Sequence, residues 1–329
     1  MRTLFIILAS SMIITGCSIF NPHGTWGERG QFWCNERYRE SKNWGEPERN
    51  ASLKGYMYAL SAALALQSDD PRDLEARAHH FAIPRRLEVV DKPDRLRSGF
   101  EVITFRLKPL VAGEREEIII AFAGSNDRSD WITTNLNPFG KKQYDEAVEY
   151  TQNIIASGVA KNRRLVVAGI SLGGGLAIHV LKNEALEPYI DEAWAINPSP
   201  KIYASLPATA AMKSKTWLVY SDREILTWGR GPLRHFIRGG GSIEPGPGQT
   251  AVFKLLSSNR TYAHFRWGIA RQMLWVADYE LSLGKENEWT EPLAILADSE
   301  FRSCLSERSK YGIKKALQPV GGRPDYSGH

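Results

Sequence analysis

Cysteine is scarce in this chain of 329 residues, which contains three: Cys17, Cys34 and Cys304. So few cysteines exclude a disulfide-dense scaffold and a cysteine-rich zinc module. The sequence also lacks a long basic run, and the net charge is only +5. Scattered lysines and arginines are typical of a solvated surface, so we expect no nucleic-acid partner. With 43% hydrophobic and 10% aromatic residues, the chain is too apolar to be disordered.

Long hydrophobic segments are scarce as well. The apolar stretch from Leu4 to Ile14 follows Arg2 and is too short to span a bilayer comfortably. A basic start, an apolar centre and a small-residue site form the three-part pattern of a secretory signal over residues 1–16. The residues from Ile14 to Cys17 resemble a bacterial lipobox, which implies cleavage before Cys17 and its acylation, for example by palmitate. A short N-terminal membrane anchor is the alternative.

The lipobox resemblance also implies a location. Ser18 stands where an aspartate would resemble an inner-membrane retention signal, so we expect an outer-membrane lipoprotein that faces the periplasm. Loss of Arg2 would reduce the net charge to +4, and the basic balance then favours an anionic lipid surface as partner. Because exported proteins meet an oxidising compartment, Cys34 and Cys304 are a candidate disulfide.

Residues 17–49 lack clear periodicity and are expected to form the lipid anchor and an N-terminal arm. Residues 50–329 are expected to form one domain, whose first helix is capped by Asn50. Short apolar runs then alternate with helical spacing, which predicts an α/β fold with a mostly parallel central sheet flanked by helices. The expected strands lie within 86–107 and at 118–122, 165–168, 193–196, 217–220 and 251–256, and the expected helices lie near 144–155, 174–181 and 265–283. Residues 226–250, which are rich in glycine, are expected to form an irregular loop.

The segment 169–173 has the pattern G-x-S-x-G. It follows the predicted strand 165–168 and precedes a predicted helix. This strand–turn–helix context is that of the nucleophile elbow of α/β-hydrolases, where small residues allow a sharp turn that exposes the serine. The sequence therefore predicts Ser171 as a nucleophile.

A serine needs a base to take its proton and an acid to orient that base, in the chain order serine, acid, histidine. Asp222 directly follows the strand 217–220 and is the predicted acid, with Glu224 as the near alternative. His264 precedes a helix and is the predicted base, and His235 is the alternative. His329 is the terminal residue and a weaker candidate.

The same chemistry needs two N–H donors for a developing oxyanion. The residue after the nucleophile is Leu172, and the loop after the strand 118–122 contains Ser125. These are the positions that supply such donors in α/β-hydrolases. We therefore predict that Leu172 and Ser125 form the oxyanion hole, with no metal ion in the site.

Three stretches together resemble the class 3 lipase family: 118–125, 130–132 and 166–177. The family has arginine where Ala123 stands and histidine where Ile170 stands. The resemblance covers roughly residues 100–270. It implies hydrolysis of carboxylic esters, often acylglycerols or phospholipids, through an acyl-enzyme and without a cofactor.

Two other functions remain open from the sequence. The same triad could act on a thioester or a small soluble ester. A third class is a non-catalytic envelope lipoprotein that uses a hydrolase fold for binding.

Overall fold

The computed structural model describes residues 31–32, 44–67, 79–124, 141–200, 202–203, 207–222, 224, 226, 242–257, 262–283 and 289–301. Several predictions concern residues outside these ranges: the signal segment 1–16, acylation of Cys17, the disulfide of Cys34 and Cys304, and the roles of Ser125, His235 and His329. Among the described helices, none is both long and apolar enough to cross a bilayer.

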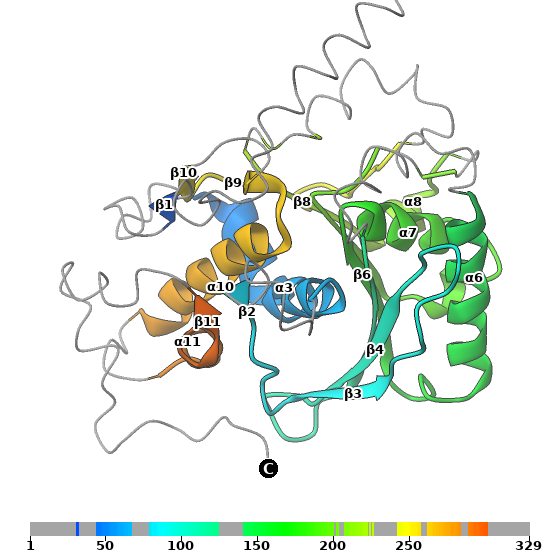
Figure 1. Ribbon diagram of the computed structural model, residues 1–329, viewed down its shortest axis with the longest axis horizontal. Coiled ribbons are helices and arrows are strands. Elements are labelled where there is room, and N and C mark those ends of the chain that lie inside the picture. The colour runs from blue at the N-terminus through cyan, green and yellow to red at the C-terminus, as the bar shows by residue number, and fades with distance from the viewer. Residues whose placement is uncertain are drawn as a thin grey trace, which may run out of the picture.

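The centre of the fold is a seven-stranded sheet (Figure 1). Its strands lie side by side in chain order: β3 (Leu87–Asp91), β4 (Val102–Leu107), β5 (Glu117–Phe122), β6 (Arg164–Ile170), β7 (Glu192–Ile196), β8 (Thr216–Ser221) and β9 (Thr250–Phe253). β3, β4 and β5 pair antiparallel, whereas β5 to β9 pair parallel. The predicted mostly parallel sheet is thus confirmed.

The order of the strands explains which helices cover which face. Parallel strands that follow one another in one direction, with right-handed crossovers, place their connecting helices on the same face. That face packs against α6 (Lys141–Ala156), α7 (Leu172–Leu181) and α8 (Ala210–Lys215). The opposite face must be covered by helices from outside this run, and these are α3 (Glu46–Ala65) and α10 (Arg266–Ser282) (Figure 1).

Smaller elements lie around this core. They are the 3₁₀ turns η4 (Glu187–Tyr189) and η6 (Tyr262–His264), the helix α11 (Glu291–Asp298), and two short antiparallel pairs, β1 (Gln31–Phe32) with β10 (Leu256–Ser257) and β2 (His79–His80) with β11 (Glu300–Phe301). The turn η6 leads directly into α10, and this connection places His264 at the sheet edge.

The central strands are buried on both faces. In β5, Ile119 and Ala121 belong to the core beneath α3 and α10, whereas Ile118 and Ile120 belong to the core beneath α6 and α7. Side chains of a strand point alternately to its two faces, so each face takes every second residue. This double burial explains the continuous apolar runs, which predicted the strands correctly.

The helix α3 begins earlier in the chain than the spacing of its apolar residues predicts. α3 starts at Glu46 with Gly45 as its N-cap, so the expected cap at Asn50 is wrong. The Gly45 N–H donates to the Glu48 carboxylate at 2.7 Å, and Pro47 lies in the first turn. Proline and acidic residues are favoured there because the first N–H groups of a helix have no acceptor within it.

α3 contacts the sheet closely at Gly55. A Cβ atom at this position would lie 2.3 Å from the Trp194 ring, which is fully buried and stacks on Trp217 at 4.7 Å between centroids. Only a residue without a side chain fits between the helix and this tryptophan pair.

We therefore expect Gly55→Ala to destabilise the protein by about 1–3 kcal/mol through overpacking. Helix propensity alone predicts the opposite sign, a gain of up to about 1 kcal/mol. Urea unfolding measures the difference, with the exposed neighbour substitution Leu53→Ala as the control. A Gly55→Ala variant as stable as the wild type, or more stable, would contradict this packing.

Candidate active site

Ser171 lies in the turn between the end of β6 and the start of α7. Its backbone has φ 59° and ψ −121°, in a region that residues other than glycine rarely adopt. Such conformations persist only where the surrounding structure enforces them, and they cluster at functional sites. The local geometry is that of the predicted nucleophile elbow, and together with the sheet it gives the α/β-hydrolase fold.

The glycines of the motif are required by close contacts. A Cβ on Gly169 would lie 2.2 Å from the Gly173 backbone, and a Cβ on Gly173 would lie 2.1 Å from the Phe122 carbonyl oxygen. Side chains at either position would separate α7 from β5 and β6. The two glycines of the pattern G-x-S-x-G are therefore required because the elbow packs tightly on the ends of β5 and β6.

Backbone hydrogen bonds hold the elbow from both sides. The Ser171 N–H donates to the Ile196 carbonyl at 3.0 Å. The Ser171 carbonyl accepts from the N–H groups of Gly175 at 3.3 Å and Ser199 at 2.8 Å. These contacts join the turn to its own helix and to the segment after β7, which keeps the uncommon backbone conformation of Ser171 in place.

The structure brings the predicted base to the predicted nucleophile. His264 Nε2 lies 3.0 Å from Ser171 Oγ, although the two residues are 93 positions apart. Both side chains lie at the edge of the sheet where the parallel strands end, and each residue is 7% exposed. The turn η6 presents the imidazole there just before α10 begins.

The carboxylate that the structure places against the imidazole is that of Glu224, the near alternative to the predicted Asp222. Glu224 Oε2 lies 2.8 Å from His264 Nδ1. The backbone of Asp222 still continues the sheet, since its N–H donates to the Phe253 carbonyl at 2.8 Å. The chain turns only afterwards, where the Glu224 N–H donates to the Ser221 carbonyl at 3.3 Å. This turn carries Glu224 back over the strand ends towards the histidine.

The charges fix the direction of the two hydrogen bonds. A carboxylate can only accept, so His264 Nδ1 carries a proton and donates it to Glu224. His264 Nε2 is then the acceptor for the Ser171 hydroxyl. Glu224 is 2% exposed, and its Oε2 also accepts from the Leu226 N–H at 2.8 Å. A buried, fixed carboxylate of this kind holds the imidazole in one orientation.

Leu172 is one of the two expected oxyanion donors. Leu172 is the first residue of α7, so its N–H has no acceptor within the helix. The loop after β5 approaches it, because a Cβ on Gly124 would lie 3.6 Å from the Leu172 nitrogen. Ser125, the second expected donor, follows Gly124 and lies outside the described residues.

His179 contributes to packing and not to this site. Its ring meets Tyr144 edge-on at 5.1 Å, and its Nδ1 lies 2.8 Å from the Ile202 carbonyl oxygen. Burial lowers the pKa of this imidazole below its usual value. Among the described residues, no group of three or more histidine, cysteine, aspartate or glutamate side chains is placed to hold a metal ion.

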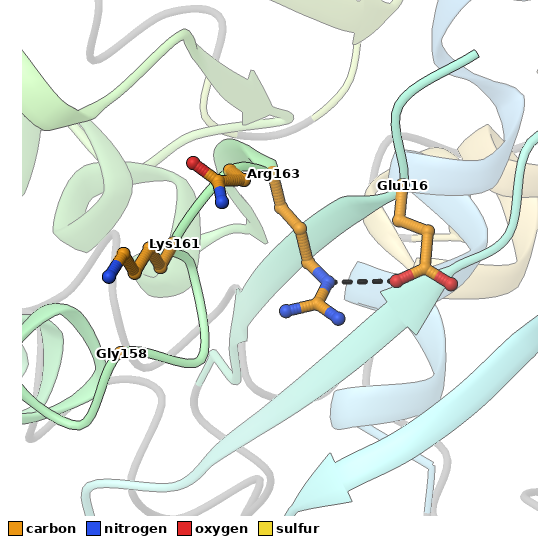
Figure 2. Close-up of a pocket in the computed structure, with 5 residues that line it drawn as sticks. Glu116, Gly158, Lys161 and Arg163 are labelled. Atoms are coloured by element: carbon orange, nitrogen blue, oxygen red, sulfur yellow. Dashed lines mark hydrogen bonds and ion pairs between the residues drawn. The ribbon is translucent and has the colours of Figure 1, made fainter. Parts of the chain in front are cut away.

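A surface hollow of about 450 Å³ lies where the parallel strands β5 and β6 begin, at the end opposite to Ser171 (Figure 2). Its lining includes Glu116 and Arg163, which pair at 2.8 Å just before β5 and β6 begin. Ser171 follows the far end of β6, so the seven residues of this strand separate the hollow from the serine. The hollow is therefore no part of the candidate active site.

Comparison with known proteins confirms the lipase-like resemblance. Residues 62–185 match a phospholipase-like family described as the Tle-like phospholipase domain. A 65-residue stretch is 43% identical to the extracellular phospholipase A1 of Serratia liquefaciens. That stretch covers 19% of each protein, so the match spans about a fifth of the relative's length. The family match includes the Ser171 elbow and ends before Glu224 and His264.

Three solved lipases are similar to the chain at low sequence identity. A structure of fungal lipases is 14% identical, with a TM-score of 0.43, over 65% of this chain and 94% of that one. The Lip2 lipase of Yarrowia lipolytica is 12% identical, with a TM-score of 0.37, over 68% and 91%. Lipase II of Rhizopus niveus is 14% identical, with a TM-score of 0.40, over 57% and 77%. The fold assignment rests on the strand order and the elbow.

Proposed function

We propose that this protein is a serine hydrolase that cleaves carboxylic esters of lipids, in the manner of a lipase or a phospholipase A. The observation that carries the proposal is the buried chain of hydrogen bonds from Ser171 to His264 to Glu224. The match to a phospholipase-like domain over residues 62–185 supports lipid esters as the substrate class. The name of the Serratia relative, a phospholipase A1, agrees with that class.

The reaction would proceed in two stages, acylation of Ser171 and hydrolysis of the acyl-enzyme. His264 Nε2 takes the hydroxyl proton while Ser171 Oγ bonds to the ester carbonyl carbon. The tetrahedral oxyanion accepts hydrogen bonds from the N–H of Leu172 and from Ser125. When the carbon–oxygen bond breaks, His264 returns the proton to the leaving alcohol. Water then attacks the acyl-enzyme by the same route and releases the carboxylic acid and free Ser171.

The place of action follows from the N-terminal prediction. Acylation of Cys17 would hold the hydrolase on a membrane, where its substrate is. The proposed location is the outer membrane, with the protein facing the periplasm. Incorporation of radiolabelled palmitate into the wild type and its absence from Cys17→Ala is the expected result. A label that also enters Cys17→Ala would contradict the anchor.

The substrate class is tested by comparing four substrates at equal concentration: phosphatidylglycerol vesicles, emulsified triolein, dissolved p-nitrophenyl acetate and a soluble acyl thioester. We expect release of fatty acid from the vesicles or the emulsion to be the fastest reaction. A Ser171→Ala preparation supplies the background rate.

The other outcomes select the other functions. A preference for the dissolved ester or the thioester would contradict the lipid assignment and favour a soluble esterase or thioesterase. No hydrolysis of any of the four would favour a non-catalytic envelope protein.

A further inference from the structure

The segment directly after β7 is centred on Asn197, a fully buried asparagine. Its backbone is left-handed, with φ 40°, a conformation that asparagine tolerates better than most residues. Its N–H donates to the Val219 carbonyl of β8 at 2.8 Å. Asn197 thus lies at the carboxyl end of β7, between β6, which leads to the elbow, and β8, which leads to the acid.

The Asn197 amide connects the two segments that carry the acid and the base. Its Oδ1 accepts from the Ser221 N–H at 2.9 Å. Its Nδ2 donates to the carbonyl oxygens of Ala263 at 3.2 Å and His264 at 3.4 Å. Ser221 in turn accepts from the Glu224 N–H, so a single side chain spans the turn that presents the acid and the turn that presents the base.

The residues on either side of Asn197 hold the nucleophile. The Ile196 carbonyl accepts from the Ser171 N–H, and the Ser199 N–H donates to the Ser171 carbonyl. The nucleophile, the acid and the base are therefore all joined to one stretch of four residues, 196–199. A purely local turn would bond to its own neighbours, whereas these partners come from segments 24 and 67 residues away.

We propose that Asn197 is a positioning residue that fixes the distance and angle between Glu224, His264 and Ser171. The inference rests on the proposed function, because it concerns the geometry of the same three residues. A buried amide that uses both its acceptor and its donors sets a unique arrangement of its partners. Displacement of a reacting group by about 1 Å can cost 100-fold in rate, so loss of this amide should slow catalysis without removing any catalytic residue.

Two substitutions separate the functions of the side chain. Asn197→Gly keeps the left-handed backbone accessible and removes all three contacts. Asn197→Asp keeps the size and the acceptor for the Ser221 N–H, but it sets a carboxylate against the carbonyl oxygens of Ala263 and His264. Both variants leave Ser171, His264 and Glu224 in the chain.

Two other substitutions serve as matched controls. Asn162→Gly changes another left-handed asparagine, with φ 62°, at the opposite end of β6. Thr216→Val removes a buried hydrogen bond, from Thr216 Oγ1 to the Met212 carbonyl, at the start of β8. Thr216→Val therefore reports what a loss of stability alone does to activity.

The experiment measures kcat and KM on a p-nitrophenyl ester, the rate of labelling of Ser171 by a fluorophosphonate, and the melting temperature. For both Asn197 variants we expect kcat to fall about 10- to 100-fold and the labelling rate to fall in parallel, while KM changes less than about twofold. Both controls should keep wild-type kcat. If Asn197→Gly does not fold, Asn197→Asp decides alone.

Wild-type kcat in a folded Asn197 variant would overturn the positioning role. So would a loss of kcat no larger than that of Thr216→Val at the same melting temperature. Failure of the proposed function is a different result, because the wild type would then hydrolyse none of the esters or Ser171→Ala would hydrolyse them as fast as the wild type. A Ser171-dependent enzyme that tolerates Asn197→Gly refutes this inference alone.

Discussion

Replacing Ser171 by alanine should lower kcat for ester hydrolysis by roughly 10⁴- to 10⁶-fold. The hydroxyl oxygen is the atom that would bond to the substrate carbonyl, and its proton is the one that His264 Nε2 is placed to remove. The remaining N–H of Leu172 and the binding of substrate would still give slow hydrolysis above the rate in water. KM should change little, because the hydroxyl contributes mainly to the transition state.

Ser61→Ala is the control for this substitution. Ser61 is also a buried serine, and its hydroxyl donates to the Met57 carbonyl within α3 at 2.8 Å. Its replacement should leave kcat near the wild-type value. Equal hydrolysis by Ser171→Ala and Ser61→Ala would refute the nucleophile assignment.

Replacing Glu224 by alanine should lower kcat by roughly 10³- to 10⁴-fold. Without the carboxylate, His264 loses the acceptor that holds its Nδ1 proton and orients Nε2 towards Ser171. The protonated imidazole of the transition state would also lose its negative partner inside a nearly solvent-free site. Steady-state kinetics on a soluble ester measures the loss.

The matched control lies two residues away. Asp222→Ala removes a carboxylate of the same charge from an exposed position, so kcat should change by no more than about threefold. Glu224→Gln keeps an acceptor but removes the charge, and its kcat should lie between those of Glu224→Ala and the wild type. A larger loss of kcat in Asp222→Ala than in Glu224→Ala would assign the role of the acid to Asp222.

The central part of the fold was predictable because its signals are local. Strands buried on both faces must be apolar throughout, as in β5 and β6, so their runs stand out in the sequence. The elbow was predictable because Gly169 and Gly173 touch backbone atoms, which leaves no room for other residues. The pairing of Ser171 with His264 followed from the chain order of a hydrolase triad and from the helix that follows the histidine.

The remaining features depend on contacts between distant segments. Asp222 and Glu224 both follow β8, and only the turn at Ser221 decides which carboxylate reaches His264. The start of α3 at Glu46 depends on polar residues that have no apolar spacing. Asn197 gave no signal by itself, since its partners Ser221 and His264 lie 24 and 67 residues further along the chain.

The measurement that tests the central claim most directly is covalent labelling by a fluorophosphonate, with the modified residue identified by mass spectrometry. If Ser171, His264 and Glu224 act as one unit, the label is found on Ser171 alone. Its rate of attachment then falls in His264→Ala and Glu224→Ala and stays at the wild-type value in Asp222→Ala. A label on another residue, or an unchanged rate in His264→Ala, would contradict the assignment of Ser171 as a nucleophile activated by His264.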